Sequence, residues 1–257
     1  ARAAASAGRP IGIHVCVDTG IGRVGVPYRA AEALIRDLAA RPGVRIDGLM
    51  MTFTEDGPFD REQLARFTAL SQALAAAGIG VGRRHAASSY TLFQHGPETH
   101  LDMLRTGMVL YGIFPATGFR RQGRGLDLRP AVALKARVAY VKQLAAGESA
   151  GYERAYVASR PTWVATLPVG HADGWPRAAA KGARVRIGGA TYPVIASVSA
   201  SHTIVEIGDR PAVAVGDEAV LFDWQDGSRP EDVAEACGAS VYDLTMHLGG
   251  HLPRLAV

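Results

Sequence analysis

The sequence predicts an α/β region followed by an all-β region. Residues 1 to about 115 alternate between short strand-like runs and helical patterns, which is typical of βα units. After residue 130 the runs are short, β-branched and punctuated by Gly or Asp. The length of 257 residues suits one large domain or two ordinary domains of about 150 residues each. We therefore expect a βα domain at residues 1–125 and a β-rich domain at residues 126–257.

The first region carries the signals of alternating strands and helices. Pro27 stands where a helix would begin, and that helix should end before residues 41–43. A second helix is expected over residues 59–78, with Gly78 as its C-terminal cap. The expected strands of this region are residues 11–17, 44–53, 78–89 and 108–115.

The second region is predicted to be built mainly of strands. Two short helices should follow near its end, each introduced by a capping box, Ser228 with Glu231 and Ser240 with Asp243. The segments expected to form strands are residues 132–144, 162–170, 183–189, 191–200, 203–207 and 218–222.

Composition and charge exclude several classes of function. The net charge of +4 is scattered along the chain, which gives little support to nucleic-acid binding. No apolar run reaches the ~18 residues of a membrane span, and the N-terminus is a poor signal peptide, so we expect a cytoplasmic protein. Cys16 and Cys237 lack metal-ligand spacing, so we expect two buried thiols and no metal site.

Several motifs carry residues suited to chemistry. DTGIGRVGV (18–26) joins a strand to a helix and offers Arg23 to an anion, although a tight turn with a solvated Arg fits as well. HAASS (85–89) supplies a ring nitrogen and hydroxyls at a strand end, where a core role for the histidine is the simpler reading. LRTGMVLYGIFP (104–115) adds Arg105, and GYERAY (151–156) adds Tyr152, which packing alone would also explain.

Taken together, these segments resemble the PLP-dependent alanine racemase family (fold-type III). DTGIGRVG, HAASS, RTGMVLYGIFP, AGYERAY, GHADGWPR, VSAS and HLPR occur in the family's order over nearly the whole chain. The resemblance implies a TIM-like (β/α) barrel followed by a β-rich domain. It also implies interconversion of L- and D-amino acids by α-proton transfer, with D-alanine for peptidoglycan precursors as the family's product.

The resemblance assigns roles to individual residues. Arg105 matches the arginine that faces the pyridine nitrogen of PLP, and Arg23 matches a residue that binds the phenolic oxygen. Tyr152 matches the tyrosine that moves the α-proton on one face of the substrate. Since that tyrosine comes from the partner subunit, a head-to-tail homodimer is implied. The cofactor-binding set is Arg23, His85, Ser88, Ser89, Arg105, Gly107 and Met108, of which Ser89, Gly107 and Met108 match the phosphate site.

Two features predict that the chain is incomplete as an enzyme. The three lysines are Lys135, Lys142 and Lys181, so residues 1–134 contain none. The family's Schiff-base lysine, which follows the first barrel strand, therefore has no counterpart. Only about half of the eight βα units of a barrel can be counted. We expect the C-terminal portion of a racemase, a partial TIM-like barrel with a β-rich domain, inactive alone.

Other positions depart from the family's pattern. At the substrate entrance, Ala200 and Ser201 replace Met-Asp, and His171 replaces a tyrosine, which should widen the pocket for substrates larger than alanine. Drift in a decayed or non-catalytic homologue, acting as a binding or dimerization module, would explain the same substitutions. A related barrel decarboxylase is disfavoured because it needs an acidic residue at the position of Arg105. The remaining departures are Cys16 for a lysine, Thr52 for a histidine, Ser88 for an asparagine and Gly250 for a tyrosine.

Overall fold

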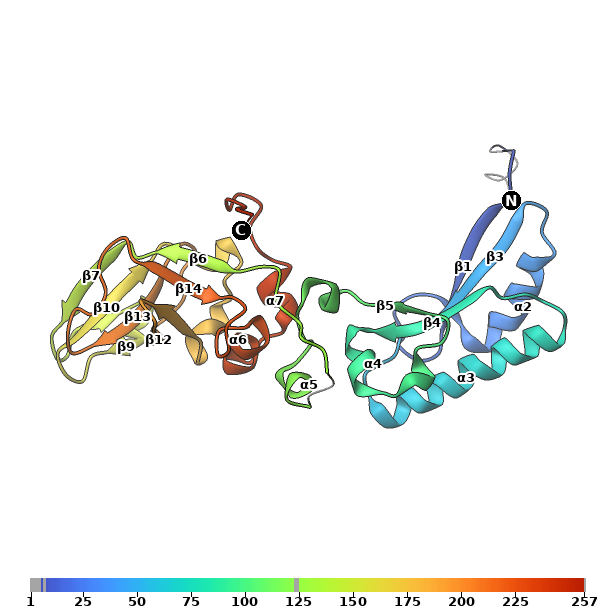
Figure 1. Ribbon diagram of the computed structural model, residues 1–257, viewed down its shortest axis with the longest axis horizontal. Helices are drawn as coiled ribbons and strands as arrows, with labels where there is room; N and C mark the ends of the chain where they lie inside the picture. The colour runs from blue at the N-terminus through green and yellow to red at the C-terminus, as the bar shows by residue number, and fades with distance from the viewer. Residues whose placement is uncertain (1–5, 7, 123–124, 257) are drawn as a thin grey trace. The chain divides into compact units, whose positions relative to one another are not determined.

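The computed structural model describes residues 6, 8–122 and 125–256, which form two compact units (Figure 1). Unit 1 is Ala1–Leu110 and unit 2 is Tyr111–Val257. The division therefore falls earlier in the chain than the boundary after residue 125 that the sequence suggested. Among the described residues, no helix is long and apolar enough to cross a membrane.

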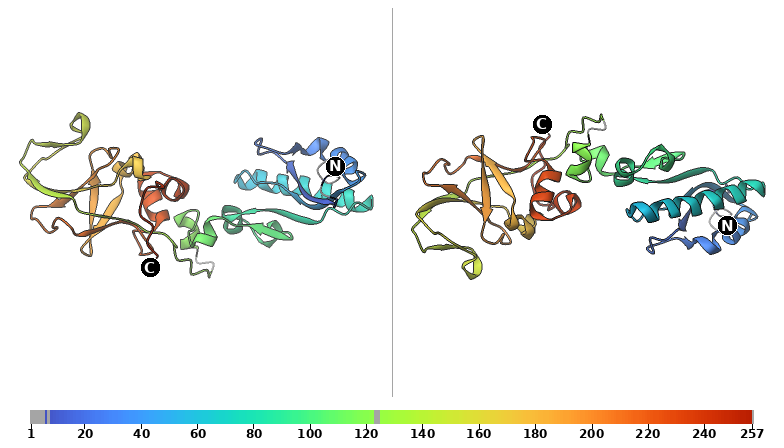
Figure 2. Two further views of the ribbon diagram at one scale, coloured as in Figure 1. Left: turned by 90° about the horizontal axis from the view of Figure 1, so that it is seen from above. Right: turned by 90° about the horizontal axis from the view of Figure 1, so that it is seen from below.

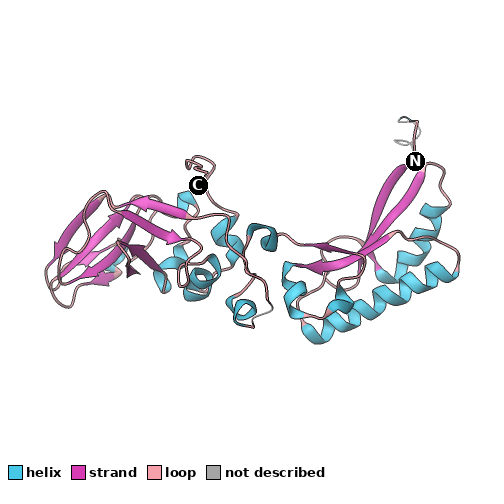
Figure 3. Cartoon of the chain, viewed as in Figure 1, coloured by secondary structure: helices cyan, strands magenta, loops and turns pink. Residues whose placement is uncertain are grey.

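Unit 1 is an open parallel sheet with helices packed against it (Figure 3). The sheet order is β2-β1-β3-β4-β5, and every pairing is parallel, which agrees with the expected succession of βα units. The strands are β1 (Ile11–Asp18), β2 (Val26–Pro27), β3 (Val44–Met50), β4 (Arg83–Ser88) and β5 (Met103–Arg105). The α-helices are α2 (Tyr28–Ala39), α3 (Gly57–Ala76) and α4 (Ser89–Gln94), with 3-10 turns at Pro97–Thr99 and Met108–Tyr111.

The core of unit 1 lies between this sheet and helices α2 and α3. Val17 and Leu49 from the strands pack in one buried cluster with Ile35 and Phe67 from the helices. Gly78, at φ 73°, takes the left-handed conformation just after α3, so its expected role at the helix end is confirmed. Burial of this face explains the periodic apolar residues of the second helix.

The expected strand at residues 108–115 is wrong. Met108–Tyr111 forms a 3-10 turn instead, closed by the Leu110 N–H donating to the Gly107 carbonyl at 3.0 Å. The fourth full strand is β5, whose Met103 and Arg105 pair with β4. Only Met108 of this turn is buried, and Leu110 and Tyr111 are exposed, so the apolar run did not mark a buried strand.

Unit 2 is built around a seven-stranded antiparallel sheet (Figure 2). Its order is β6-β14-β11-β12-β13-β10-β7, and each segment expected to contain a strand does so. The strands are β6 (Leu134–Arg137), β7 (Tyr140–Leu144), β10 (Thr162–Leu167), β11 (Arg184–Ile187), β12 (Ala190–Ile195), β13 (Thr203–Gly208) and β14 (Glu218–Phe222); β8 (Ser149–Ala150) and β9 (Tyr156–Val157) form a separate pair. The 3-10 turns are η3 (Tyr152–Arg154), η4 (His171–Asp173) and η5 (Arg177–Lys181).

Three short helices complete unit 2, namely α5 (Thr117–Arg121), α6 (Pro230–Cys237) and α7 (Val241–Thr245). The capping box at α7 is confirmed, since the Ser240 N–H donates to Asp243 at 3.0 Å. The capping box expected at Ser228 is wrong. Pro230 begins α6, Arg229 precedes it, and Glu231 pairs with Arg229 instead of closing a box.

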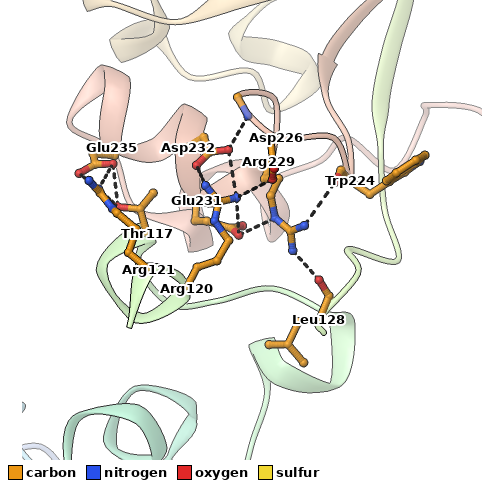
Figure 4. Close-up of polar contacts among 11 residues, drawn as sticks. Thr117, Arg120, Arg121, Leu128, Trp224, Asp226, Arg229, Glu231, Asp232 and Glu235 are labelled. Carbon is orange, nitrogen blue, oxygen red and sulfur yellow. Dashed lines mark hydrogen bonds and ion pairs between the residues drawn. The ribbon is translucent and has the colours of Figure 1, made fainter. Parts of the chain in front are cut away.

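Polar contacts explain why α5 belongs with unit 2 (Figure 4). Arg120 binds Asp232 of α6 through both terminal nitrogens, and Arg121 lies 2.8 Å from Glu235. Thr117 donates to the same Glu235 carboxylate at 2.7 Å. These contacts attach α5 to α6. Helix α5 therefore belongs to the β-rich unit, although it precedes the all-β part of the sequence.

Candidate active site

The carboxyl ends of the parallel strands bring His85 and Arg105 together. His85 lies on β4 and Arg105 ends β5, its neighbour in the sheet. An Arg105 terminal N–H donates to His85 Nδ1 at 2.8 Å. The loops at this end of parallel strands are where α/β proteins place their sites. The sequence predicted both residues, and the structure brings them into contact.

Arg105 is fixed by the main chain as well as by His85. Its Nη2 donates to the Met51 carbonyl at 2.7 Å and to the Ala86 carbonyl at 3.2 Å, with Thr52 Oγ1 at 3.4 Å. Burial lowers the pKa of this guanidinium below its usual value, although an arginine keeps its charge in proteins. Among the described contacts its Nε–H donates to nothing.

His85 is buried between two basic groups. Its Nε2 lies 2.7 Å from His14 Nδ1, on the opposite side from Arg105. Because Nδ1 accepts from Arg105, the neutral ring carries its proton on Nε2 and donates it to His14. Burial, Arg105 and His14 together lower the pKa of His85 to about 4. The core role that the sequence favoured for this histidine therefore coexists with a positioning role toward Arg105.

Ser89, Gly107 and Val109 form a small cradle of hydrogen-bond donors. The N–H groups of Gly107 and Val109 converge on Ser89 Oγ at 2.9 and 3.5 Å. Among the described contacts the Ser89 O–H has no acceptor of its own. A Cβ added at Gly107 would meet no atom within 4 Å, so there is open space beside the cradle. The Ser89 O–H, oriented by these two N–H groups and beside open space, has the chemistry to donate to a phosphate group.

Two of the expected cofactor residues use their side chains elsewhere. Ser88 caps α4 by accepting from the Thr91 N–H at 3.3 Å. The Met108 side chain is buried, which leaves its backbone as the part that could face a ligand.

Arg23 lies in an exposed loop shaped by Asp18 and Cys16. The Asp18 carboxylate accepts from the N–H groups of Gly20 and Gly22, and these bonds lower its pKa. The Cys16 thiol donates to the Val24 carbonyl at 3.5 Å. Burial raises the pKa of this thiol, so Cys16 supplies no charge to hold Arg23. Arg23 has no hydrogen bond or ion pair among the described contacts.

Tyr152 lies in unit 2, on the η3 turn, and is 74% exposed. It borders a hollow of about 280 Å³ together with Gly151, Ser197, Ser199, His202 and Ile204. Glu153 takes a left-handed conformation at φ 56° directly after Tyr152. Strain of this kind in a non-glycine residue is concentrated at functional sites.

The entrance residues adjoin this hollow. The His171 N–H donates to the Ser199 carbonyl, and the Ala172 N–H to the Ala200 carbonyl, both at 2.9 Å. Ala200 and Ser201 are exposed beside Ser199. An Arg177 Nη2 lies 3.0 Å from His171 Nε2. The structure therefore gathers Tyr152 and the three entrance residues on one surface of unit 2.

Sequence reasoning missed several groups around Arg105 and His85. His14, which contacts His85, was not singled out, although a second histidine two strands away in the sheet was a usable signal. The carbonyls of Met51 and Ala86 carry no signal, because every residue has a carbonyl. Ser197 was also missed, and a small serine between apolar neighbours gave no reason to choose it.

Comparison with known proteins agrees with both units. The model of the alanine racemase N-terminal domain matches residues 1–115, and that of the C-terminal domain matches residues 131–256. The expectation that the barrel segment with the Schiff-base lysine is lacking is not supported, because the N-terminal domain is matched. The five-stranded parallel sheet is consistent with part of a (β/α) barrel.

Individual relatives are similar over nearly the whole chain. The alanine racemase of Desulfosudis oleivorans is 36% identical over 99% of this chain and 68% of its own length. That of Symbiobacterium thermophilum is 38% identical over 96% of this chain and 66% of its own. The crystal structure of the Streptomyces lavendulae alanine racemase, 32% identical, gives a TM-score of 0.88 over 99% of this chain and 68% of that one. The chain belongs to the alanine racemase family.

Proposed function

We propose that the chain serves the PLP-dependent interconversion of L- and D-amino acids, with its two units contributing different groups. Unit 1 supplies the cofactor subsites, and unit 2 supplies Tyr152 as a proton carrier. The observation that carries the proposal is the fixed guanidinium of Arg105. Two carbonyls and His85 hold its terminal nitrogens, and among the described contacts the Arg105 Nε–H has no acceptor. Family membership supports the reaction class, since the relatives are named alanine racemases.

Bound PLP would draw electron density away from the substrate's α-carbon and so make the α-proton removable. Ser89, oriented by the N–H groups of Gly107 and Val109, would hold its phosphate, and the Arg105 Nε–H would bind its pyridine nitrogen. The donor groups described above fit those parts of the cofactor. Arg23 would reach the phenolic oxygen from its exposed loop.

Arg105 would tune the reaction by keeping its own protons. A guanidinium stays protonated at neutral pH, so a pyridine nitrogen facing it accepts a hydrogen bond and gains no proton. That arrangement limits electron withdrawal and favours proton return over decarboxylation. His85 supports it, because a neutral imidazole accepts from Arg105 without adding a second positive charge.

Tyr152 would take or return the α-proton on one face of the substrate. A phenol has an ordinary pKa of about 10, so positive charge nearby must help it act as a base. We propose that this charge comes from a second copy of the chain in a head-to-tail homodimer. The exposure of Tyr152 supports a role toward a partner.

The opposite face needs a second proton carrier, which we propose is a lysine outside residues 1–257. Unit 1 has no lysine, and the three of unit 2 lie at β6, β7 and η5. Lys135 is engaged with Glu218 at 2.8 Å. We therefore expect no racemisation by these 257 residues alone. The cytoplasmic location stays a prediction.

The test is D-alanine formation from L-alanine with PLP. The chain alone should form none, whereas a chimaera carrying the remaining third of the Streptomyces lavendulae relative should be active. In that chimaera Tyr152→Phe should lower turnover by about 10²–10⁴-fold, the usual contribution of a general base. Tyr140→Phe, at another exposed tyrosine of unit 2, is the matched control.

Two results would contradict the proposal. Turnover by the chain alone would refute the need for an external lysine, and full activity of Tyr152→Phe would refute its role. A non-catalytic binding module predicts neither PLP binding nor turnover by the chimaera.

A further inference from the structure

The hollow beside Tyr152 is larger than an alanine side chain requires. Its volume of about 280 Å³ compares with the roughly 10–15 Å³ that a cavity needs to hold one water molecule. A tyrosine that carries the α-proton lies within a few ångströms of every group on the α-carbon. The hollow is therefore placed to receive a substrate side chain, provided that the proposed function holds.

One polar atom of the hollow lacks a partner. The Ser197 hydroxyl is buried without a hydrogen bond among the described residues. A buried hydroxyl without a partner is unfavourable, so a ligand that satisfies it gains affinity. Rotation about the Cα–Cβ bond offers this hydroxyl other staggered positions. Ala196, just before it, is held in a left-handed conformation at φ 58°, as is Glu153, the residue after Tyr152.

A second polar group is His202, on the rim of the hollow. Its Nδ1 lies 3.0 Å from Ser201 Oγ, and its main chain is held by Ser199, whose hydroxyl accepts from the His202 N–H at 2.9 Å. Among the described contacts its Nε2 has no partner. The loop thus fixes the imidazole while leaving one ring nitrogen available beside the hollow.

The remaining lining residues favour an uncharged ligand. Ile204 gives an apolar surface for methylene groups. No Asp, Glu, Lys or Arg is among the described residues that line the hollow. A charged side chain would therefore find no counter-ion among these lining residues. A carboxamide can donate and accept at once without carrying charge, which matches a hydroxyl and a ring nitrogen.

We propose that this hollow is a subsite for a carboxamide side chain, such as that of glutamine or asparagine, bound by Ser197 and His202. Its methylene groups pack on Ile204. The substrate class of the site is therefore amino acids with uncharged, hydrogen-bonding side chains longer than that of alanine.

The first test measures binding and needs no turnover. L-glutamine is titrated into the ¹⁵N-labelled chain, and the amide signals of Ser197 and His202 are followed by NMR, with PLP present and absent. We expect saturable shifts at both residues, and affinities for L-lysine and L-glutamate at least threefold weaker. Absence of shifts at these residues, or equal affinity for L-lysine, would overturn the subsite.

Two variants test the Ser197 hydroxyl and the empty volume of the hollow separately. Ser197→Ala removes only the hydroxyl, and Ser197→Met fills the hollow; both should weaken glutamine binding, about tenfold for the methionine variant. Ser159→Ala, at an exposed serine outside the lining, should bind like the unaltered chain. Unchanged affinity in both Ser197 variants would refute the proposal.

The second test uses the active chimaera and measures kcat/KM for glutamine relative to alanine. Ser197→Met should lower that ratio about tenfold. If no chimaera racemises any amino acid while glutamine still binds at Ser197, the proposed function fails and the subsite stands. If alanine is racemised and glutamine neither binds nor reacts, the proposed function stands and the subsite fails.

Discussion

His85 accepts a hydrogen bond from Arg105 at 2.8 Å, and the buried imidazole is thereby held neutral next to a guanidinium. The contact joins β4 to β5 at the end of the sheet where the sequence placed the cofactor residues. It orients Arg105 together with the carbonyls of Met51 and Ala86. Protonation of His85 would therefore disturb both the stability of unit 1 and the position of the guanidinium.

Acid should destabilise unit 1 through His85. Its pKa is about 4 in the folded chain and about 6.5 when unfolded, so the unfolded chain takes up the proton first as pH falls. The stability is fully present above pH 6.5 and is lost as pH falls toward 4. The loss by pH 4.5 is roughly 2–3 kcal/mol.

Urea unfolding followed by circular dichroism at pH 7 and pH 4.5 measures this loss. His85→Gln should be less stable at pH 7 and show a smaller decrease between the two pH values. His247→Gln, at an exposed histidine, should keep the full decrease. An equal decrease in His85→Gln and the unaltered chain would show that His85 is not the group responsible.

Arg229 should stabilise unit 2 by neutralising a buried acid. Its Nε lies 2.8 Å from the Glu231 carboxylate, whose side chain is fully buried, and its Nη2 donates to the Leu128 carbonyl (Figure 4). Arg229→Met should cost about 3–5 kcal/mol, because among the described ion pairs Glu231 then keeps Arg120 alone, at 3.5 Å. Combining it with Glu231→Gln should recover part of the loss, since no buried charge then remains.

Tryptophan fluorescence during urea unfolding reports this directly, since all three tryptophans lie in unit 2. The control is Arg129→Met, whose ion pair with Asp127 is exposed and should contribute at most about 1 kcal/mol. Similar losses in Arg229→Met and Arg129→Met would contradict a buried ionic contact.

Gly112 should tolerate no side chain, because the backbone of another residue approaches it closely. A comparison with Gly125 separates this effect from backbone strain. Gly112 and Gly125 share φ 72°, but a Cβ at Gly112 would lie 1.7 Å from the Arg129 carbonyl oxygen, whereas one at Gly125 meets open space. Both alanine variants carry backbone strain of about 1–3 kcal/mol. Gly112→Ala should lower the free energy of unfolding further, and equal values for the two variants would refute the close approach.

The sequence predicted the elements of unit 2 best. An alternating run such as residues 203–207 fits a strand that buries every second residue, and β13 has this burial pattern. The run at residues 108–115 was ambiguous, because Met108 is buried in a turn as it would be in a strand. The helix start at Pro230 was displaced from Ser228, because proline is itself suited to the first helical position.

The sequence named candidate site residues, but it could not predict their contacts. Arg105, Ser89 and Gly107 were found from motif order, and their closeness follows from neighbouring parallel strands. Main-chain carbonyls bind Arg105, and His14 contacts His85 on the side away from Arg105. No motif marks these contacts. The hollow beside Tyr152 depends on the space left around Ser197, which only the packed structure reveals.

PLP binding tests the central claim most directly. The purified chain is titrated with PLP and followed by cofactor absorbance and by dialysis, for the unaltered chain, Ser89→Ala and Arg105→Leu, with the exposed Arg36→Leu as control. We predict saturable binding, weakened about tenfold by Ser89→Ala through loss of a bond to charged phosphate. Arg105→Leu should shift the absorbance maximum, and the control should do neither. Binding that is absent in the unaltered chain, or equal in all four proteins, would contradict a cofactor site formed by Arg105 and Ser89.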